Sequence, residues 1–228
     1  GPSGTFLFDF SQAGPNEGEQ DTRIFQPGDR GGINWRDAQG NNTSRGWFVP
    51  NYPLHVNVHD QEVHGHDWVV GSQVTLTIDA PGGAHFNETL TVVNDPQACG
   101  QPCFDMTSRG WVLAPGQTVT LSDGNLTKTV VVSTLAITNI DPLHDQISGS
   151  ADPGAQVLVN INAQGGLPRY VVADGSGHWL ADFSMPGAQA DEVVVDLTPG
   201  DFGGVIQRNP GGNNDDGTLE YFMVGEGF

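Results

Sequence analysis

Pro153-Gly154-Ala155-Gln156-Val157-Leu158-Val159-Asn160-Ile161 is the stretch that decides the fold. The Pro-Gly pair supplies the fixed and positive φ angles of a tight turn, and apolar residues then stand at every second position from Val157 to Ile161. This alternation predicts a strand with one buried face. Similar runs cover residues 74–78, 119–121 and, less strictly, 193–197, and no segment of a dozen residues has a helical period. The sequence therefore predicts an all-β chain of antiparallel sandwiches.

The two ends of the chain share one sequence pattern. Gly4-Thr5-Phe6-Leu7-Phe8-Asp9-Phe10-Ser11 aligns with Gly177-His178-Trp179-Leu180-Ala181-Asp182-Phe183-Ser184, and Pro27-Gly28-Asp29-Arg30-Gly31-Gly32 aligns with Pro199-Gly200-Asp201-Phe202-Gly203-Gly204. Each of these prolines is followed 13 residues later by a Gly-Asn-Asn turn, at 40–42 and at 212–214. A match that keeps its spacing over this length indicates an internal repeat.

A more divergent copy lies between these two. Val63-His64-Gly65 followed by Gly71-Ser72-Gln73-Val74 parallels Ile147-Ser148-Gly149 followed by Gly154-Ala155-Gln156-Val157. We interpret the chain as the second half of a repeat at residues 1–53, a complete sandwich at 54–133 and another at 134–228. The half unit has three explanations: it is the cut end of a longer array, it adds strands to the middle unit, or another molecule completes it.

These patterns resemble the bacterial immunoglobulin-like repeats of large secreted adhesins and surface stalk proteins. Three segments carry the resemblance: 147–157 at the opening of a domain, 173–179 at its central hairpin and 37–44 at its last hairpin. The resemblance covers most of 134–228 and residues 4–49, and the middle unit fits it loosely. It implies tandem immunoglobulin-like sandwiches outside the cell, which serve as spacers or adhesive arms.

The charge balance excludes several partners. The 228 residues hold 8 Lys+Arg against 27 Asp+Glu, a formal net charge of −19. Nucleic acids and anionic membrane surfaces need clustered basic residues, which this chain does not have. It also has no apolar run of about 18 residues, so we expect no membrane insertion.

The two cysteines, Cys99 and Cys103, are close enough in sequence to form a disulfide, with a pair of free thiols as the alternative. They make a poor zinc site because no second Cys/His pair stands at finger spacing.

Seven histidines suggest a metal site. His55, Asn57 and His59 should share one strand face, and His64 and His66 another. Varied polar residues on the solvent side of a strand are the more ordinary interpretation.

Calcium is the metal that the turns favour. Carboxylate and amide oxygens occur in pairs at three places, and calcium prefers six to eight such ligands. The candidate ligands are Asp37, Asn41, Asp123, Asn125, Asp215 and Asp216. Ordinary turn formation by Asn and Asp explains the same residues.

The aromatic residues suggest a second function. Trp35 and Trp47 are candidates to stack on sugar rings, whereas Trp111 and Trp179 stand beside apolar strand residues and are expected in the core. No Gly-x-Ser-x-Gly or Gly-Lys-Ser/Thr motif occurs, so the chain is not predicted to be an enzyme.

The sequence as a whole predicts a non-enzymatic extracellular or cell-surface protein with a structural or adhesive role. Its expected partners are other copies of itself or neighbouring repeat domains, and completion of the open half unit would build an array or filament. A carbohydrate-binding module that recognises surface glycans is the alternative.

Overall fold

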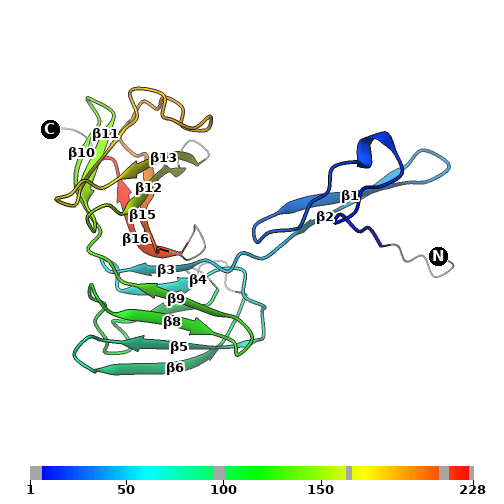
Figure 1. The fold of residues 1–228 in the computed structure, drawn as a ribbon. Coiled ribbons are helices and arrows are strands. Elements are labelled where there is room, and N and C mark those ends of the chain that lie inside the picture. The colour runs from blue at the N-terminus through cyan, green and yellow to red at the C-terminus, as the bar shows by residue number, and fades with distance from the viewer. Residues whose placement is uncertain (1–6, 95–100, 163–165, 211–215, 226–228) are drawn as a thin grey trace. The chain divides into compact units, whose positions relative to one another are not determined.

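The computed structural model describes residues 7–94, 101–162, 166–210 and 216–225, and the chain divides into two compact units, 1–51 and 52–228 (Figure 1). Strands form nearly all of the regular structure, which confirms the predicted all-β class. Among the elements that lie wholly within the described residues, the exception is the short 3-10 helix η1 (Glu17–Glu19). No helix among the described residues has the length and apolar character needed to cross a bilayer.

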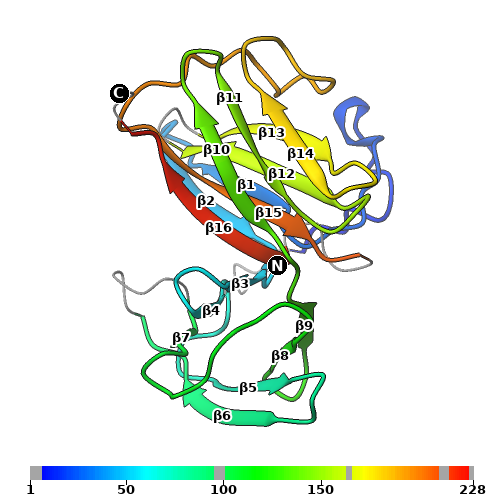
Figure 2. The same ribbon diagram turned by 90° about the vertical axis from the view of Figure 1, so that its left-hand side faces the viewer.

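The C-terminal sandwich packs a three-stranded sheet against four strands of a larger sheet. The three-stranded sheet has the order β10 (Ala136–Asp141), β11 (Gln146–Ser150), β14 (His178–Asp182). The facing strands have the order β13 (Leu167–Val172), β12 (Gln156–Ile161), β15 (Phe202–Arg208), β16 (Gly217–Met223). Figure 2 shows β10, β11 and β14 as one layer in front of β12 and β15. All neighbouring strands within this sandwich are antiparallel, and the run predicted at 157–161 lies in β12.

The middle sandwich has the same strand order. One side is β3 (Leu54–Asn57), β4 (Glu62–Gly65), β7 (Cys103–Asp105), and the other is β6 (His85–Thr91), β5 (Gln73–Asp79), β8 (Thr118–Ser122), β9 (Thr127–Val131). In both sandwiches the first, second and fifth strands face the other four, which is an immunoglobulin-like arrangement. Each sandwich has its own hydrophobic core, one drawn from residues 54–132 and one from 147–224.

The two sandwiches are joined through a parallel strand pair. Strands β16 and β3 pair in parallel, so the two sheets to which they belong merge into one of seven strands. A buried ion pair lies at this junction: Lys128 Nζ, in β9, is 2.9 Å from Oδ2 of Asp216. The same Asp216 accepts a hydrogen bond of 2.9 Å from the backbone N–H of Leu54. The junction therefore depends on a charge pair as well as on strand pairing.

The strand predicted at residues 193–197 is wrong. Val195 and Leu197 are buried in the core, but this segment runs alongside it without a strand ladder. Side chains satisfy part of its backbone: Arg169 donates to the carbonyl of Val193 at 3.1 Å, and Asp145 accepts from the N–H of Leu197 at 2.8 Å. The N–H of Val195 donates to the backbone carbonyl of Phe183 at 3.0 Å. The apolar alternation here correctly indicates which side chains are buried, but it does not indicate a strand.

The strands in the described part of the N-terminal unit form a hairpin. Its strands are β1 (Arg30–Arg36) and β2 (Asn42–Phe48), which pair antiparallel from Arg30 opposite Phe48 to Arg36 opposite Asn42. By the sequence alignment these strands correspond to β15 and β16, and the loop before them corresponds to residues 183–201.

Candidate functional site

The hairpin of the N-terminal unit begins with the same turn as its C-terminal counterpart. The N–H of Asp29 donates to the carbonyl of Gln26 at 3.0 Å, and the N–H of Asp201 donates to that of Thr198 at 3.0 Å. In each turn the glycine has a positive φ, 87° at Gly28 and 93° at Gly200. A type II turn requires this conformation at its third residue, and glycine adopts it without steric cost. The repeated Pro-Gly therefore produces a repeated turn.

The loop that precedes this turn is also the same in both copies. Arg23 N–H donates to the carbonyl of Phe10 at 2.6 Å, and Val195 N–H donates to that of Phe183 at 3.0 Å. The loops begin alike as well, since Gly14 and Gly187 each donate to the carbonyl of a glutamate at 2.7 Å. Residues 10–49 thus have the backbone arrangement of the closing half of the C-terminal sandwich.

The burial of equivalent side chains differs sharply between the copies. Phe10 is 46% exposed and Phe25 is 41% exposed, whereas their counterparts Phe183 and Leu197 are 0% and 2% exposed. None of the described residues from 7 to 51 is buried. We call the set Phe10, Phe25, Ile33 and Trp47 the open face. In the C-terminal copy these positions are filled by core residues.

The cause of this exposure is the pairing of the strands. In the C-terminal sandwich β15 pairs with β12 as well as with β16, and β14 pairs with β11. Strand β1 pairs only with β2 among the described residues, and residues 7–9, which align with part of β14, form no strand. Among its described residues, the unit has counterparts of strands β15 and β16 but none of β10 to β13, which form the opening half.

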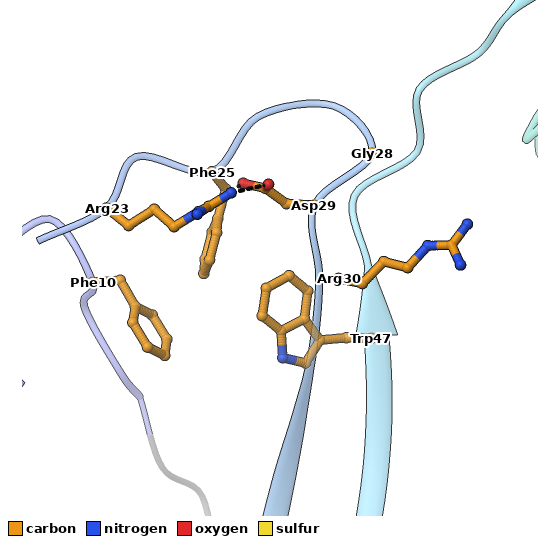
Figure 3. Close-up of a pocket in the computed structure, with 7 residues that line it drawn as sticks. All are labelled: Phe10, Arg23, Phe25, Gly28, Asp29, Arg30 and Trp47. Atoms are coloured by element: carbon orange, nitrogen blue, oxygen red, sulfur yellow. Dashed lines mark hydrogen bonds and ion pairs between the residues drawn. The ribbon is translucent and has the colours of Figure 1, made fainter. Parts of the chain in front are cut away.

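The aromatic rings of the open face surround a shallow depression. Phe10, Phe25 and Trp47 point toward one another in Figure 3. The ring centroids are 5.2 Å apart for Phe10 and Phe25, and 4.7 Å apart for Phe25 and Trp47, which meet edge to face. The depression has a volume of about 490 Å³ and is lined by Phe10, Arg23, Phe25, Gly28, Asp29, Arg30 and Trp47. It offers aromatic surface to an apolar partner.

One ion pair lies at the rim of the depression. Arg23 Nε donates to Asp29 Oδ2 at 3.2 Å, and the backbone N–H of Gln26 donates to the same oxygen at 2.8 Å. These hydrogen bonds, that from Arg23 first, hold the pKa of the Asp29 carboxyl below its ordinary value. Arg23 stands where the C-terminal copy has the core residue Val195. The rim is therefore polar around an apolar centre.

The tryptophans proposed for sugar stacking both lie on the hairpin. Trp35 is 61% exposed, and Trp47 is half-buried opposite Gly31. The register places both on the same face of the hairpin, four positions or about 13 Å apart. The predicted core position of Trp179 is confirmed, and Trp111 is half-buried against the middle core.

The predicted calcium ligands lie at separate places. Asp37 accepts hydrogen bonds from the N–H groups of Gln39 and Asn41 at 3.0 and 2.8 Å, within the turn between β1 and β2. Asp123 accepts one of 2.9 Å from the N–H of Asn125 in the turn between β8 and β9. Asp216 bonds Lys128 at the junction, and Asp215 lies outside the described residues. Each described aspartate thus has a local structural role.

Calcium binding at these turns stays a prediction, and thermal unfolding tests it. An ion that binds only the folded state stabilises it by an amount that rises with the logarithm of free ion above the Kd, so binding predicts a higher unfolding midpoint in millimolar calcium than in chelator. Equal midpoints would leave these aspartates with only the hydrogen bonds and the ion pair described above. Magnesium at the same concentration controls for ionic strength.

The predicted disulfide involves a residue that the structure leaves undescribed. Cys103, in β7, is disulfide-bonded, and Cys99 lies outside the described residues. The Cys99–Cys103 pairing therefore stays a prediction.

The histidines are arranged differently from what the sequence predicts. His55 of β3 lies directly opposite His64 of β4, so the two expected faces are one face of one sheet. His59 follows Asn57 outside the strand and is exposed, and His64 is fully buried. The interpretation that these histidines are ordinary polar residues on the solvent side of a strand is wrong for His64. The pattern within each strand does not show how the two strands are registered against each other.

Comparisons with known proteins give only distant structural likenesses. No known protein family matches the chain, and no curated protein matches it. Among solved structures, a tetra-tandem repeat from the extending region of a large adhesion protein is 16% identical and covers 85% of this chain and 55% of its own, with a TM-score of 0.27. Two fibronectin type III domains of chicken tenascin are 17% identical over 72% of this chain and 91% of theirs, with a TM-score of 0.27.

A third similar structure is the BSP domain of a biofilm-associated protein. It is 16% identical and covers 76% of this chain and 28% of its own, with a TM-score of 0.30. This chain thus spans about half of the adhesion repeat and under a third of the biofilm protein. The immunoglobulin-like class of the two sandwiches rests on their own strand order.

Proposed function

We propose that this protein is a non-enzymatic adhesive or structural repeat protein of the cell surface, and that its open N-terminal unit assembles with a neighbouring molecule. The single observation that carries the proposal is the contrast between the two copies. The same hydrogen bonds produce a buried core in one copy and an exposed apolar face in the other. The occupant that fits this face is the opening half of another repeat, with strands patterned like residues 146–161.

Two features of the N-terminal unit support such a partner. The free edge of β1 presents backbone donors and acceptors of the kind that β12 satisfies on β15. The open face presents apolar side chains, and covering such surface contributes about 25 cal/mol for each Å² removed from water. A strand added at this edge would satisfy both requirements together. A head-to-tail contact of this type that does not close would produce a filament.

Sedimentation of the chain over a range of concentrations tests the assembly. We expect multimers at micromolar concentration, and we expect Ile33→Asp to weaken association by at least about a hundredfold because it buries an unpaired charge. Asn34→Asp is the matched control, since Asn34 is exposed on the opposite face of the same strand. A chain that stays monomeric throughout, or two variants that behave alike, would contradict the proposal.

The alternative of a carbohydrate-binding module is favoured by one observation, the exposed ring of Trp35. Trp47 favours assembly instead, because it is the equivalent of the buried Phe222. Trp47 lies opposite Gly31, just as Phe222 lies opposite the matching Gly203. Glycan binding that is lost in Trp35→Ala and kept in Ile33→Asp would support the sugar site. The two roles are thus separated by variants on one strand.

A further inference from the structure

Three histidines gather on the outer face of the middle sandwich. His55 in β3 and His64 in β4 are directly opposite each other, and His66 lies two residues beyond His64, so all three side chains project from the same side of the sheet. The N–H of His66 donates to the carbonyl of Pro53 at 3.1 Å, which extends the β3–β4 ladder by one rung. The backbone thus fixes the positions of all three residues. We call them the three-histidine cluster.

The rings of the cluster form a nearly equilateral triangle. Their centroids are 5.6 Å apart for His55 and His64, 5.4 Å for His55 and His66, and 5.8 Å for His64 and His66. One nitrogen from each ring can be chosen so that all three lie within 4.8 Å of one another. Ligands of a tetrahedral zinc ion are about 3.4 Å apart, given Zn–N distances of about 2.1 Å. Small rotations of the side chains would bring the nitrogens to that separation.

The surroundings of the cluster restrict its chemistry. His64 is fully buried, while His55 and His66 are half-buried, so one side of the site is closed and the other is open to solvent. Cys103 is the residue opposite His64 on β7, but it is disulfide-bonded and offers no thiolate. The ring of Tyr221 is 6.4 Å from that of His64. The donor set is therefore three imidazoles, which suits zinc, copper and nickel and does not suit calcium or magnesium.

The geometry points to a zinc-class transition-metal site formed by His55, His64 and His66, with one further coordination position open toward solvent. Three protein ligands with a fourth position for water or an incoming group form a common zinc arrangement. The site is built within the middle sandwich, so it does not depend on the assembly of the N-terminal unit. A bound ion would tie β3 to the segment after β4 and stabilise this sandwich increasingly as free zinc rises above the Kd.

Zinc titration of the metal-free chain, in competition with a coloured chelator, tests the site. We expect one Zn²⁺ per chain, and we expect His55→Ala and His66→Ala each to weaken binding by at least about a hundredfold, since even partners of metal ligands are worth up to that factor. His59→Ala is the control, because His59 is exposed and stands outside the cluster. NMR signals of the imidazole rings should shift for three of the seven histidines.

Folding is checked separately from binding. His64 is fully buried, so His64→Ala can fail to fold, and the half-buried His55 and His66 therefore carry the test. Their variants should unfold at the same midpoint as the parent chain without metal, and only the parent and His59→Ala should gain stability from zinc. Absence of zinc binding, binding that is unchanged in both ligand variants, or loss of binding in His59→Ala would overturn the site.

Discussion

Replacing Lys128 with methionine should lower the free energy of unfolding of the 52–228 unit by about 3–5 kcal/mol. Lys128 and Asp216 are both almost fully buried, with 9% and 3% of their side chains exposed. Removing the ammonium leaves a carboxylate without its counter-charge at the junction of the two sandwiches. Its remaining described hydrogen bond, from the N–H of Leu54, does not neutralise that charge. Urea unfolding followed by tryptophan fluorescence measures the loss.

A double variant separates the lost charge balance from the lost packing. Asp216→Asn keeps an acceptor for Leu54 and removes the charge, so Lys128→Met combined with Asp216→Asn should recover part of the stability that Lys128→Met loses. Asp79→Asn is the exposed control: its pair with His85 lies at the surface, and its effect should stay within about 0.5 kcal/mol. An effect of Lys128→Met as small as that of the control would contradict a structural role for the buried pair.

Trp179→Ala should cost the C-terminal sandwich about 3–5 kcal/mol. The indole is 1% exposed, and its register partner across β11–β14 is Gly149. A Cβ built on Gly149 would lie 2.5 Å from the Trp179 ring, so the missing side chain of the glycine is what makes room for the indole. Truncating the tryptophan leaves a void that Gly149 has no side chain to fill, and the cost should therefore fall at the upper end of the range. Thermal and urea unfolding measure it.

The matched control is Trp35→Ala in the N-terminal unit. Trp35 is 61% exposed, whereas the other four tryptophans are buried or half-buried, and its removal opens no cavity. We expect a change within about 0.5 kcal/mol in the stability of the chain. Similar losses for the two tryptophans would show that Trp179 does not carry the packing of its sandwich.

The sequence predicts local structure well because the interactions that form it are local. The Pro-Gly turn at 27–28 and its copy at 199–200 form the same hydrogen bonds, since a turn closes between residues three apart. Period-two runs located β5, β8 and β12. The strand predicted at 193–197 is wrong for a physical reason. Apolar alternation requires only that alternate side chains be buried, and Val195 and Leu197 are buried without a neighbouring strand, in a segment that bonds Arg169 and Asp145.

The candidate sites were predicted less completely. The sequence placed His64 and His66 on one strand face, but it separated these histidines from His55. Their convergence depends on the register of β3 against β4, and a shift of one residue would send His55 to the core. No signal within either strand reports that register.

Sequence by itself therefore determined the strictly alternating strands β5, β8 and β12 and the Pro-Gly turn repeated at both ends of the chain, because each of these depends on residues a few positions apart. Only the tertiary structure decided which copy has a core, that three histidines lie together and that Lys128 pairs with Asp216, since these depend on contacts between distant segments. Phe10 and Phe183 occupy the same place in the same pattern, and only the presence of an opposing sheet buries one and exposes the other.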